Sequence, residues 1–408
     1  MRTYRIIIAL LSILIVSGCM PKQKQNSAVP PVSSDDYTEL SSHERLEEAI
    51  FKYDHKTFQK LLAESPGADK NKLLALAVFV GDIDIMKTLL KAGADPNYHP
   101  DEGNIEANLL FVPSLIHSTE IPKLLIDSGT DIHFRTSDGL TALHAAVEFQ
   151  DIEKAALLIQ RGINVNARSL KGNTPLHTAT GTSSTLGYIV DKFEQEGIKL
   201  SQKDKNELEL HLRAAQLEMV SLLLEKGADP NAANKGKLTP LHNAAHHGHS
   251  QVVRKLITYH ANVNILDAQG WTPLAWGIAS DDLKTVEVLL ANGADLKRMT
   301  SPYSSPLHIS VAKGNLAITK ALISYGAKLN HPIVIAEDES NFTPLHLAAT
   351  NNFPEIADLL IKKGADITVK TSKGQTVMDI INERSDRIDN FKKSGVFWKI
   401  NDALYNAL

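Results

Sequence analysis

Apolar positions in the stretch 272–293 recur at the spacing of an α-helix. Four of them fall on one face of a helix with 3.6 residues per turn, and these are Leu283, Val286, Leu289 and Leu290. Gly293 follows this run, and glycine readily takes the left-handed conformation that closes a helix. We therefore predict a helix that ends at Gly293.

A shorter helix is predicted just before it. Thr272 can cap a helix N-terminus with its hydroxyl group, and Pro273 suits the first helical position because no backbone N–H is needed there. The stretch 272–293 is thus expected to form a pair of helices. In an earlier stretch of the same kind, Ala244 and Ala245 are small enough to let neighbouring helices approach closely. Each pair covers its apolar face only when another pair stacks on it.

This pattern repeats along most of the chain. The tetrapeptide Thr-Pro-Leu-His, or a variant of it, begins at residues 141, 174, 239, 272, 305, 343 and 376, and 33 residues is the dominant interval. Gly-Ala-Asp, or a variant of it, begins at residues 93, 129, 162, 227, 260, 293, 326 and 364. Two independent marks with one period indicate a repeat architecture. The period and the tetrapeptide resemble those of ankyrin repeats from about Ser41 onward.

The resemblance implies an all-α fold, an ankyrin-repeat solenoid of stacked helix pairs joined by hairpin loops. We expect repeats over 41–373, about ten helix pairs, with degenerate units at 41–137 and 182–216. A capping box at Ser41 to Glu44 is expected to open an atypical first unit, and 374–408 to form a C-terminal capping repeat or helix.

One interval is about twice the period and allows two interpretations. It runs from Gly162 to Gly227. The segment 182–216 is either a hidden repeat, whose first helix runs on or is displaced, or a long insertion into a single repeat.

The first residues follow a different pattern. Arg2 and Arg5 precede an apolar run, Ile6 to Val16, which is too short to span a bilayer and is typical of a signal peptide. The sequence Val-Ser-Gly-Cys that ends at Cys19 resembles a bacterial lipobox. By that resemblance residues 1–18 are a cleaved lipoprotein signal peptide and Cys19 is lipidated; the alternative is an ordinary secretory signal with an incidental cysteine.

Residues 19–40 are expected to form a flexible tether after the lipidated Cys19, because they are rich in proline and polar residues. In bacteria with two membranes, an aspartate after the cysteine commonly marks retention in the inner membrane. Met20 stands there instead, which favours the outer membrane with the protein facing the periplasm. Attachment to the membrane would then rest on the N-terminal lipid.

Composition argues against several function classes. The formal net charge of −4 is slightly negative, and nothing in the composition suggests a nucleic-acid partner. Cys19 is the only cysteine, so no disulfide can form within one chain. The sequence has none of the motifs typical of serine hydrolases, zinc proteases or phosphate-binding loops. We therefore predict no catalytic residues, no cofactor and no enzymatic activity.

A group of histidines raises the question of a metal site. His242 and His246 lie one helical turn apart, and His247 and His249 follow. His242, however, holds the fourth place of the tetrapeptide, as do His144, His177, His308 and His346. A ring there can hydrogen-bond to nearby turn backbone and join one repeat to the next. His247 and His249 match the link between the two helices of an ankyrin unit. Only His246 has no place in the repeat pattern, and we therefore predict no metal site.

Partner contacts are expected where repeats differ from one another, at hairpin tips and on first helices, since ankyrin proteins generally meet their partners there. Arginines and large aromatic residues are common anchors. The candidates are Phe134, Arg135, Arg168, Leu170, Leu266, Trp276, Arg298, Met299 and Tyr303. Trp276 stands where other repeats have alanine, threonine or asparagine, and the alternative is that it only packs between repeats.

These features together predict a lipid-anchored protein of the bacterial cell envelope. It is expected to be a monomer that binds another protein through its concave surface and hairpin tips. A sharper form of the hypothesis is an immunity protein that neutralises a toxin delivered to the periplasm. The alternative is a scaffold or stabiliser of an endogenous envelope enzyme that handles oxidants or remodels the cell wall.

Overall fold

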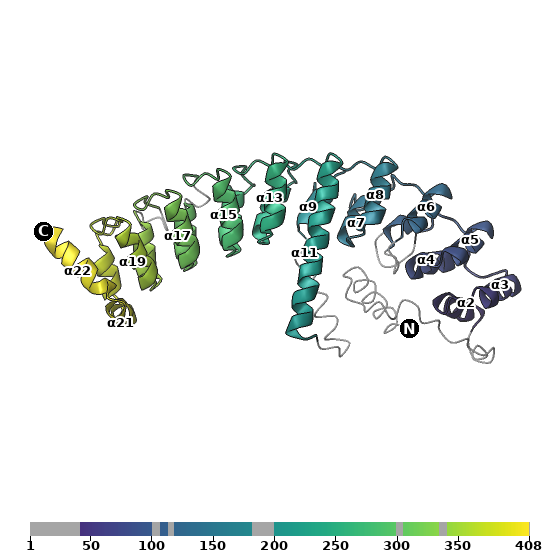
Figure 1. Ribbon diagram of the computed structural model, residues 1–408, viewed down its shortest axis with the longest axis horizontal. Coiled ribbons are helices and arrows are strands. Elements are labelled where there is room, and N and C mark those ends of the chain that lie inside the picture. Colours follow the sequence, from purple (N-terminus) through teal and green to yellow (C-terminus); the bar gives the residue numbers. More distant parts are fainter. Residues whose placement is uncertain are drawn as a thin grey trace. The chain divides into compact units, whose positions relative to one another are not determined.

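The computed structural model describes residues 41–99, 107–112, 118–181, 200–298, 305–333 and 341–407 (Figure 1). The chain divides into two compact units, unit 1 up to Asp229 and unit 2 from Pro230. The regular elements of the described residues are all helices, apart from one isolated β-bridge between Ile333 and Phe342. The predicted all-α solenoid of stacked helix pairs is confirmed.

Unit 1 is built from successive helix pairs, each a first helix followed by a second helix. The pairs are α2 (Ser42–Phe51) with α3 (His55–Glu64), α4 (Lys70–Val80) with α5 (Ile83–Lys91), the 3-10 helix η3 (Leu109–Phe111) with α6 (Glu120–Asp127), α7 (Ala142–Glu148) with α8 (Ile152–Gln160), and α9 (Pro175–Thr180) with α11 (Gln202–Glu225).

Unit 2 continues the same scheme and adds a final helix. Its pairs are α12 (Pro240–His246) with α13 (Ser250–Thr258), α14 (Pro273–Ala279) with α15 (Leu283–Ala291), α16 (Pro306–Ala312) with α17 (Leu316–Ser324), α18 (Pro344–Thr350) with α19 (Pro354–Lys362), and α20 (Val377–Asn382) with α21 (Ser385–Lys393); α22 (Val396–Ala407) follows. Within each unit, first helices pack on neighbouring first helices and second helices on neighbouring second helices.

The ends of the helices follow the chemistry that the sequence indicates. At the start of α9, the Thr174 hydroxyl accepts a hydrogen bond from the backbone N–H of His177, and Pro175 takes the first helical position. Helix α15 ends at Ala291, and Gly293 then adopts a left-handed φ of 84°. The capping box between Ser41 and Glu44 is also present, so the prediction for the start of the first unit is confirmed.

The core lies between the stacked helices. Ala244 and Ala245 are fully buried, as their small size predicts, and Val286 and Leu289 of α15 are fully buried as well. Leu283 is only half-buried, although it falls on the same apolar stripe. It is the first residue of α15, and its side chain lines a groove on the second helices.

The segment with two interpretations contains one long helix. Helix α11 has 24 residues, and in Figure 1 it extends well past the ends of α8 and α9. The Asn166 side chain donates to the carbonyl of Gly227 at 3.0 Å and accepts the N–H of Asp229 at 2.8 Å. Asn97 makes the same two bonds to the hairpin of the next repeat, at Gly129 and Asp131. The hairpins before and after this segment are therefore direct neighbours, as the insertion alternative requires.

Some of the predicted features lie outside the described residues. These are the signal peptide, Cys19 and the tether, together with residues 182–199 of the insertion. Among the helices that the structure does describe, none is both long and apolar enough to cross a membrane.

Candidate functional site

The recurring histidines hold the repeats together. Nδ1 of His144 accepts the backbone N–H of Thr141 at 3.2 Å, so the hydrogen-bond network assigns the proton of the ring to Nε2. Nε2 then donates to the carbonyl of Asn173, in the next repeat, at 3.1 Å. His242 bonds in the same way to Trp271 at 3.2 Å, and His346 to Val369 at 3.1 Å. The architectural role predicted for the fourth position is confirmed at these residues.

Burial keeps these rings neutral. It lowers the pKa of His144 and of His308 to about 4, and it also lowers the pKa of His242 and His346. A neutral ring with both nitrogens in hydrogen bonds, such as His144, has no lone pair left for a ligand. In the part of the chain that the structure describes, no three His, Cys, Asp or Glu side chains are grouped so that they could hold a metal ion.

The four candidate contact residues of unit 1 lie at two neighbouring hairpins. The Arg135 guanidinium donates to the carbonyl of Arg168 at 2.9 Å, and Arg168 donates to the carbonyl of Gly172 at 3.4 Å. Both arginines thus help to fix hairpin backbone. Leu170, by contrast, is 59% exposed, while its backbone N–H is bonded to the carbonyl of Asp138 at 2.7 Å. A rigid backbone therefore presents an exposed leucine.

Phe134, at the base of the same hairpins, is half-buried. Its ring centroid lies 4.7 Å from that of His99 and 6.1 Å from that of Phe111, in the latter case edge-on. This geometry is typical of aromatic packing. Phe134 supports the hairpin more than it offers a free contact.

The candidates of unit 2 centre on Trp276 in α14. Its indole Nε1–H donates to Oδ2 of Asp267 at 2.8 Å, and the other carboxylate oxygen of Asp267 accepts the backbone N–H of Trp271 at 2.8 Å. The Trp276 ring lies 5.1 Å from that of Trp271 and 4.8 Å from that of His246. Trp276 therefore packs against its own hairpin and the preceding repeat, yet it remains half-buried rather than buried.

The other candidates of unit 2 are less fixed. Leu266 is half-buried on the hairpin before α14, and Arg298 is exposed, with its Nε 4.0 Å from Oδ2 of Asp295. Met299 and Tyr303 lie outside the described residues.

Sequence reasoning did not include Trp271, Asp267 or His246 among the contact residues. The structure brings all three to Trp276. One signal was available for Trp271, since it directly precedes the capping threonine and is a second large aromatic residue at the same hairpin. His246 comes from the preceding repeat, so only the stacking of α12 on α14 shows its place.

Comparison with known proteins gives the family. Residues 114–204, 210–300 and 297–371 match the model of ankyrin repeats in three copies, and residues 69–99 match the single ankyrin repeat model. The chain belongs to the ankyrin repeat family. Ankyrin repeats mediate protein–protein interaction, and proteins built from them are typically adaptors without enzymatic activity.

The similar curated proteins are much longer than the regions they share with this ankyrin repeat protein. A homologue of the transient receptor potential cation channel subfamily A member 1 from Caenorhabditis elegans is 29% identical over 205 residues, 50% of this chain and 16% of that protein. Mouse Rabankyrin-5 is 32% identical over 172 residues, 41% of this chain and 14% of that protein. A probable E3 ubiquitin-protein ligase, XBOS33 from rice, is 31% identical over 183 residues, which are 43% of this chain and 35% of that protein.

Proposed function

We propose that this protein binds a partner protein through the surface formed by its first helices and hairpin tips, without catalysing a reaction. The observation that carries the proposal is the fixed position of Trp276, whose indole is held by Asp267 and by two neighbouring rings while part of it stays exposed. Tryptophan is among the residues that most often contribute strongly to binding.

Preorganisation explains why this arrangement suits binding. A side chain that is already fixed loses little conformational entropy when a partner covers it, so more of the contact energy becomes affinity. In unit 1, Leu170 is presented in the same way by a hydrogen-bonded hairpin. We propose Trp276 and Leu170 as anchors within their own units.

We further propose that the protein is a lipoprotein of the bacterial outer membrane that faces the periplasm. The lipobox-like sequence at Cys19 and the polar, proline-rich residues after it support this proposal. Substitution Cys19→Ser is expected to move the protein from the membrane fraction to the soluble fraction and to abolish labelling by radioactive palmitate. Unchanged membrane association in this variant would contradict the proposal.

For the partner, we propose a toxin delivered to the periplasm, which the protein would neutralise as an immunity protein. A rigid repeat surface whose tips differ from one another suits occlusion of an enzyme's active site. The second candidate is the scaffold role for an envelope enzyme, which rests on the same exposed anchors.

Cross-linking in whole cells tests the binding proposal. The full-length chain is expressed in a bacterial host, cross-linked and purified, and the captured proteins are identified by mass spectrometry. Trp276→Ala is expected to release a specific partner. Trp398→Ala is the matched control, because Trp398 is 54% exposed on α22, which is neither a first helix of a pair nor a hairpin tip. Equal capture by both variants would contradict the proposed surface.

The activity of the captured partner then separates the two roles. An immunity protein is expected to inhibit its partner in a purified assay, and cells without it are expected to lose protection against competitors that deliver the toxin. A scaffold is expected to leave the activity of its partner unchanged or to raise it.

A further inference from the structure

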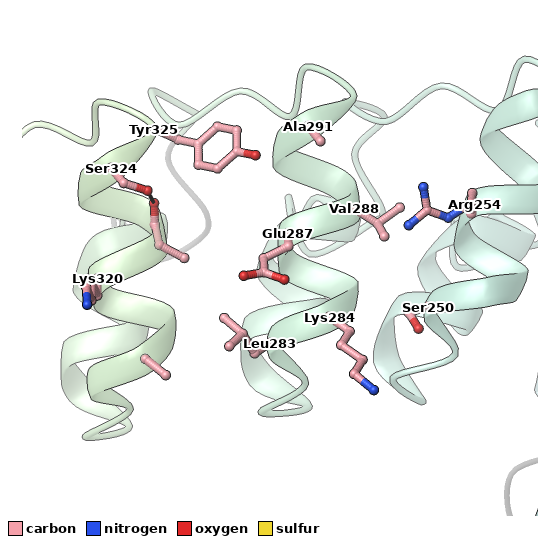
Figure 2. A pocket seen from close by; sticks show the side chains of 12 residues that line it. Ser250, Arg254, Leu283, Lys284, Glu287, Val288, Ala291, Lys320, Ser324 and Tyr325 are labelled. Atoms are coloured by element: carbon pink, nitrogen blue, oxygen red, sulfur yellow. Dashed lines mark hydrogen bonds between the residues drawn. The ribbon is translucent and has the colours of Figure 1, made fainter.

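A groove of about 760 Å³ crosses the second helices of three consecutive repeats in unit 2. Its side chains come from α13, α15 and α17 (Figure 2). We call it the second-helix groove. It does not involve the first helices or hairpin tips that the proposed function uses, so it is a separate surface.

Small residues create the space. The last residue of the second helix is Ala291 in α15 and Ser324 in α17, and both residues line the groove. Several second helices outside the groove end on long side chains, namely Lys91, Gln160, Glu225 and Lys362, whereas α6 ends on Asp127. Compared with those long side chains, Ala291 and Ser324 leave space at the ends of α15 and α17.

The charge of the groove differs from that of several other repeats as well. The second residue of the second helix is acidic in α5, α8 and α19, where a negative charge interacts favourably with the helix N-terminus. In α15 this residue is Lys284, and α13, α15 and α17 have no acidic residue in their first turns. A lysine there is unfavourable for the helix itself, and such local conflicts often mark functional positions.

Two further cations accompany Lys284. They are Arg254 of α13 and Lys320 of α17, both exposed. In the described part of the chain, none of these three cations forms an ion pair or a hydrogen bond. Figure 2 shows the guanidinium of Arg254 and the ammonium of Lys284 directed into the space between α13 and α15.

The remaining lining is mostly apolar with one carboxylate. Val288 is buried and Leu283 is half-buried, so they form an apolar base. Tyr325 is 49% exposed and stands beside the space between α15 and α17. Glu287 lies near the middle of the groove, between the positions of Arg254 and Lys320 in the neighbouring helices.

We propose that the second-helix groove docks an acidic segment of a partner protein. Carboxylates of the segment pair with Arg254, Lys284 and Lys320, and small apolar side chains between them rest on Leu283 and Val288. Glu287 carries negative charge in the groove that a flat anionic lipid surface would meet unfavourably. A peptide chain avoids this conflict because its backbone N–H groups can donate to Glu287.

The probe for this proposal is an array of fluorescein-labelled dodecapeptides. Aspartate and glutamate are placed at varied spacings, with alanine and leucine between them. The purified full-length chain is titrated with each peptide at low salt, and fluorescence anisotropy gives the affinity. We expect saturable binding of a subset of these peptides, lost when their acidic residues are replaced by the corresponding amides. The absence of any saturable binder would overturn the proposal.

Two kinds of variant separate docking from general charge attraction. Lys284→Glu is expected to weaken the tightest peptide by about tenfold, whereas the same change at the exposed hairpin residue Lys235 is expected to alter it less than about twofold. The double variant Ala291→Gln, Ser324→Gln restores long side chains without changing charge, and it is also expected to weaken binding. Unchanged peptide binding in the double variant would overturn the proposal. Equal loss of affinity in the Lys284→Glu and Lys235→Glu variants would also overturn it.

Two more controls complete the experiment. Vesicles that contain phosphatidylglycerol are titrated in parallel. If the protein binds these vesicles through Lys284 and binds none of the peptides, the groove is a lipid site and the proposal is overturned. Trp276→Ala is expected to leave the peptide affinity unchanged, which keeps the result independent of the first-helix surface. Thermal unfolding by circular dichroism verifies that each variant is folded.

Discussion

The imidazole Nε2 of His144 lies 3.1 Å from the carbonyl oxygen of Asn173, the residue directly before the threonine that caps the next repeat. A side chain of one helix pair is thus bonded to the backbone that starts the following pair. The same arrangement joins His242 to Trp271, whereas His346 bonds to the carbonyl of Val369, earlier in the hairpin that precedes the capping Thr376. Stability of the stack is therefore expected to depend on these buried polar links as well as on apolar contacts.

The link at His242 gives the first prediction. His242→Ala would leave the backbone N–H of Thr239 and the carbonyl of Trp271 without this partner and would open a cavity. We expect it to lower the free energy of unfolding by about 3 kcal/mol. Urea denaturation followed by circular dichroism measures the effect. His246→Ala is the matched control, because this histidine is exposed, and a comparable loss there would contradict the assignment.

The pH dependence of stability gives the second prediction. Burial holds the pKa of His144 and His308 at about 4, below the value of about 6.5 expected in the unfolded chain. Between these values the unfolded state binds more protons, so stability is full above about pH 6.5 and falls as the pH decreases towards 4. Each ring contributes a loss on the order of 3 kcal/mol once the pH is below both values.

Melting temperatures measured from pH 7.5 to pH 5 check this prediction. Carboxylates such as Asp366 and Asp379, whose hydrogen bonds lower their pKa below the usual value, titrate below this range. A decline that begins near pH 6.5 is therefore assigned to histidines. A melting temperature that stays constant down to pH 5 would show that the rings accept protons without cost.

Asparagines in the hairpins give the third prediction. Asn264 donates to the carbonyl of Gly293 and accepts the N–H of Asp295, which clamps one hairpin to the next. The equivalent residue of the following hairpin is Lys297, which has no carboxamide and cannot make both bonds. Lys297→Asn is expected to raise the free energy of unfolding by about 1 kcal/mol.

Thermal unfolding and urea denaturation measure this gain. Asn264→Ala is expected to have the opposite effect, since it removes an existing clamp. A lower melting temperature for the Lys297→Asn variant would show that the two hairpins do not approach closely enough for the clamp.

Lys154 gives the fourth prediction. Its side chain is 7% exposed, its ammonium donates to the carbonyl of Val112 at 3.1 Å, and burial lowers its pKa. A buried ammonium with little compensation costs stability, so Lys154→Met is expected to raise the free energy of unfolding by about 1–3 kcal/mol at pH 7.

The pH dependence distinguishes this cause from simple repacking. Because the pKa of Lys154 is lower in the folded state, the wild-type chain gains stability as the pH rises from 7 to 10, and the methionine variant lacks this gain. The difference between the two proteins should therefore shrink with increasing pH. A difference that is constant from pH 7 to pH 10 would point to packing alone.

The sequence predicted most of the fold because each repeat contains its own local signals. Threonine and proline start the first helix, glycine ends the second, and Ala244 and Ala245 fit the close contact between neighbours. These signals act within one or two turns of chain, so a single sequence reveals them. The role of the fourth-position histidines followed from their recurrence and was confirmed by their bonds.

What only the tertiary structure decided concerns contacts between repeats. Stacking placed His246 against Trp276, assigned Arg135 to the backbone of Arg168, and made the hairpins at 166 and 227 direct neighbours across the insertion. It also showed that one groove crosses three consecutive second helices, with the small residues Ala291 and Ser324 in its lining. Local sequence determines each helix pair, whereas a binding surface arises from side chains that lie about one repeat apart, and their distances exist only after the pairs have stacked.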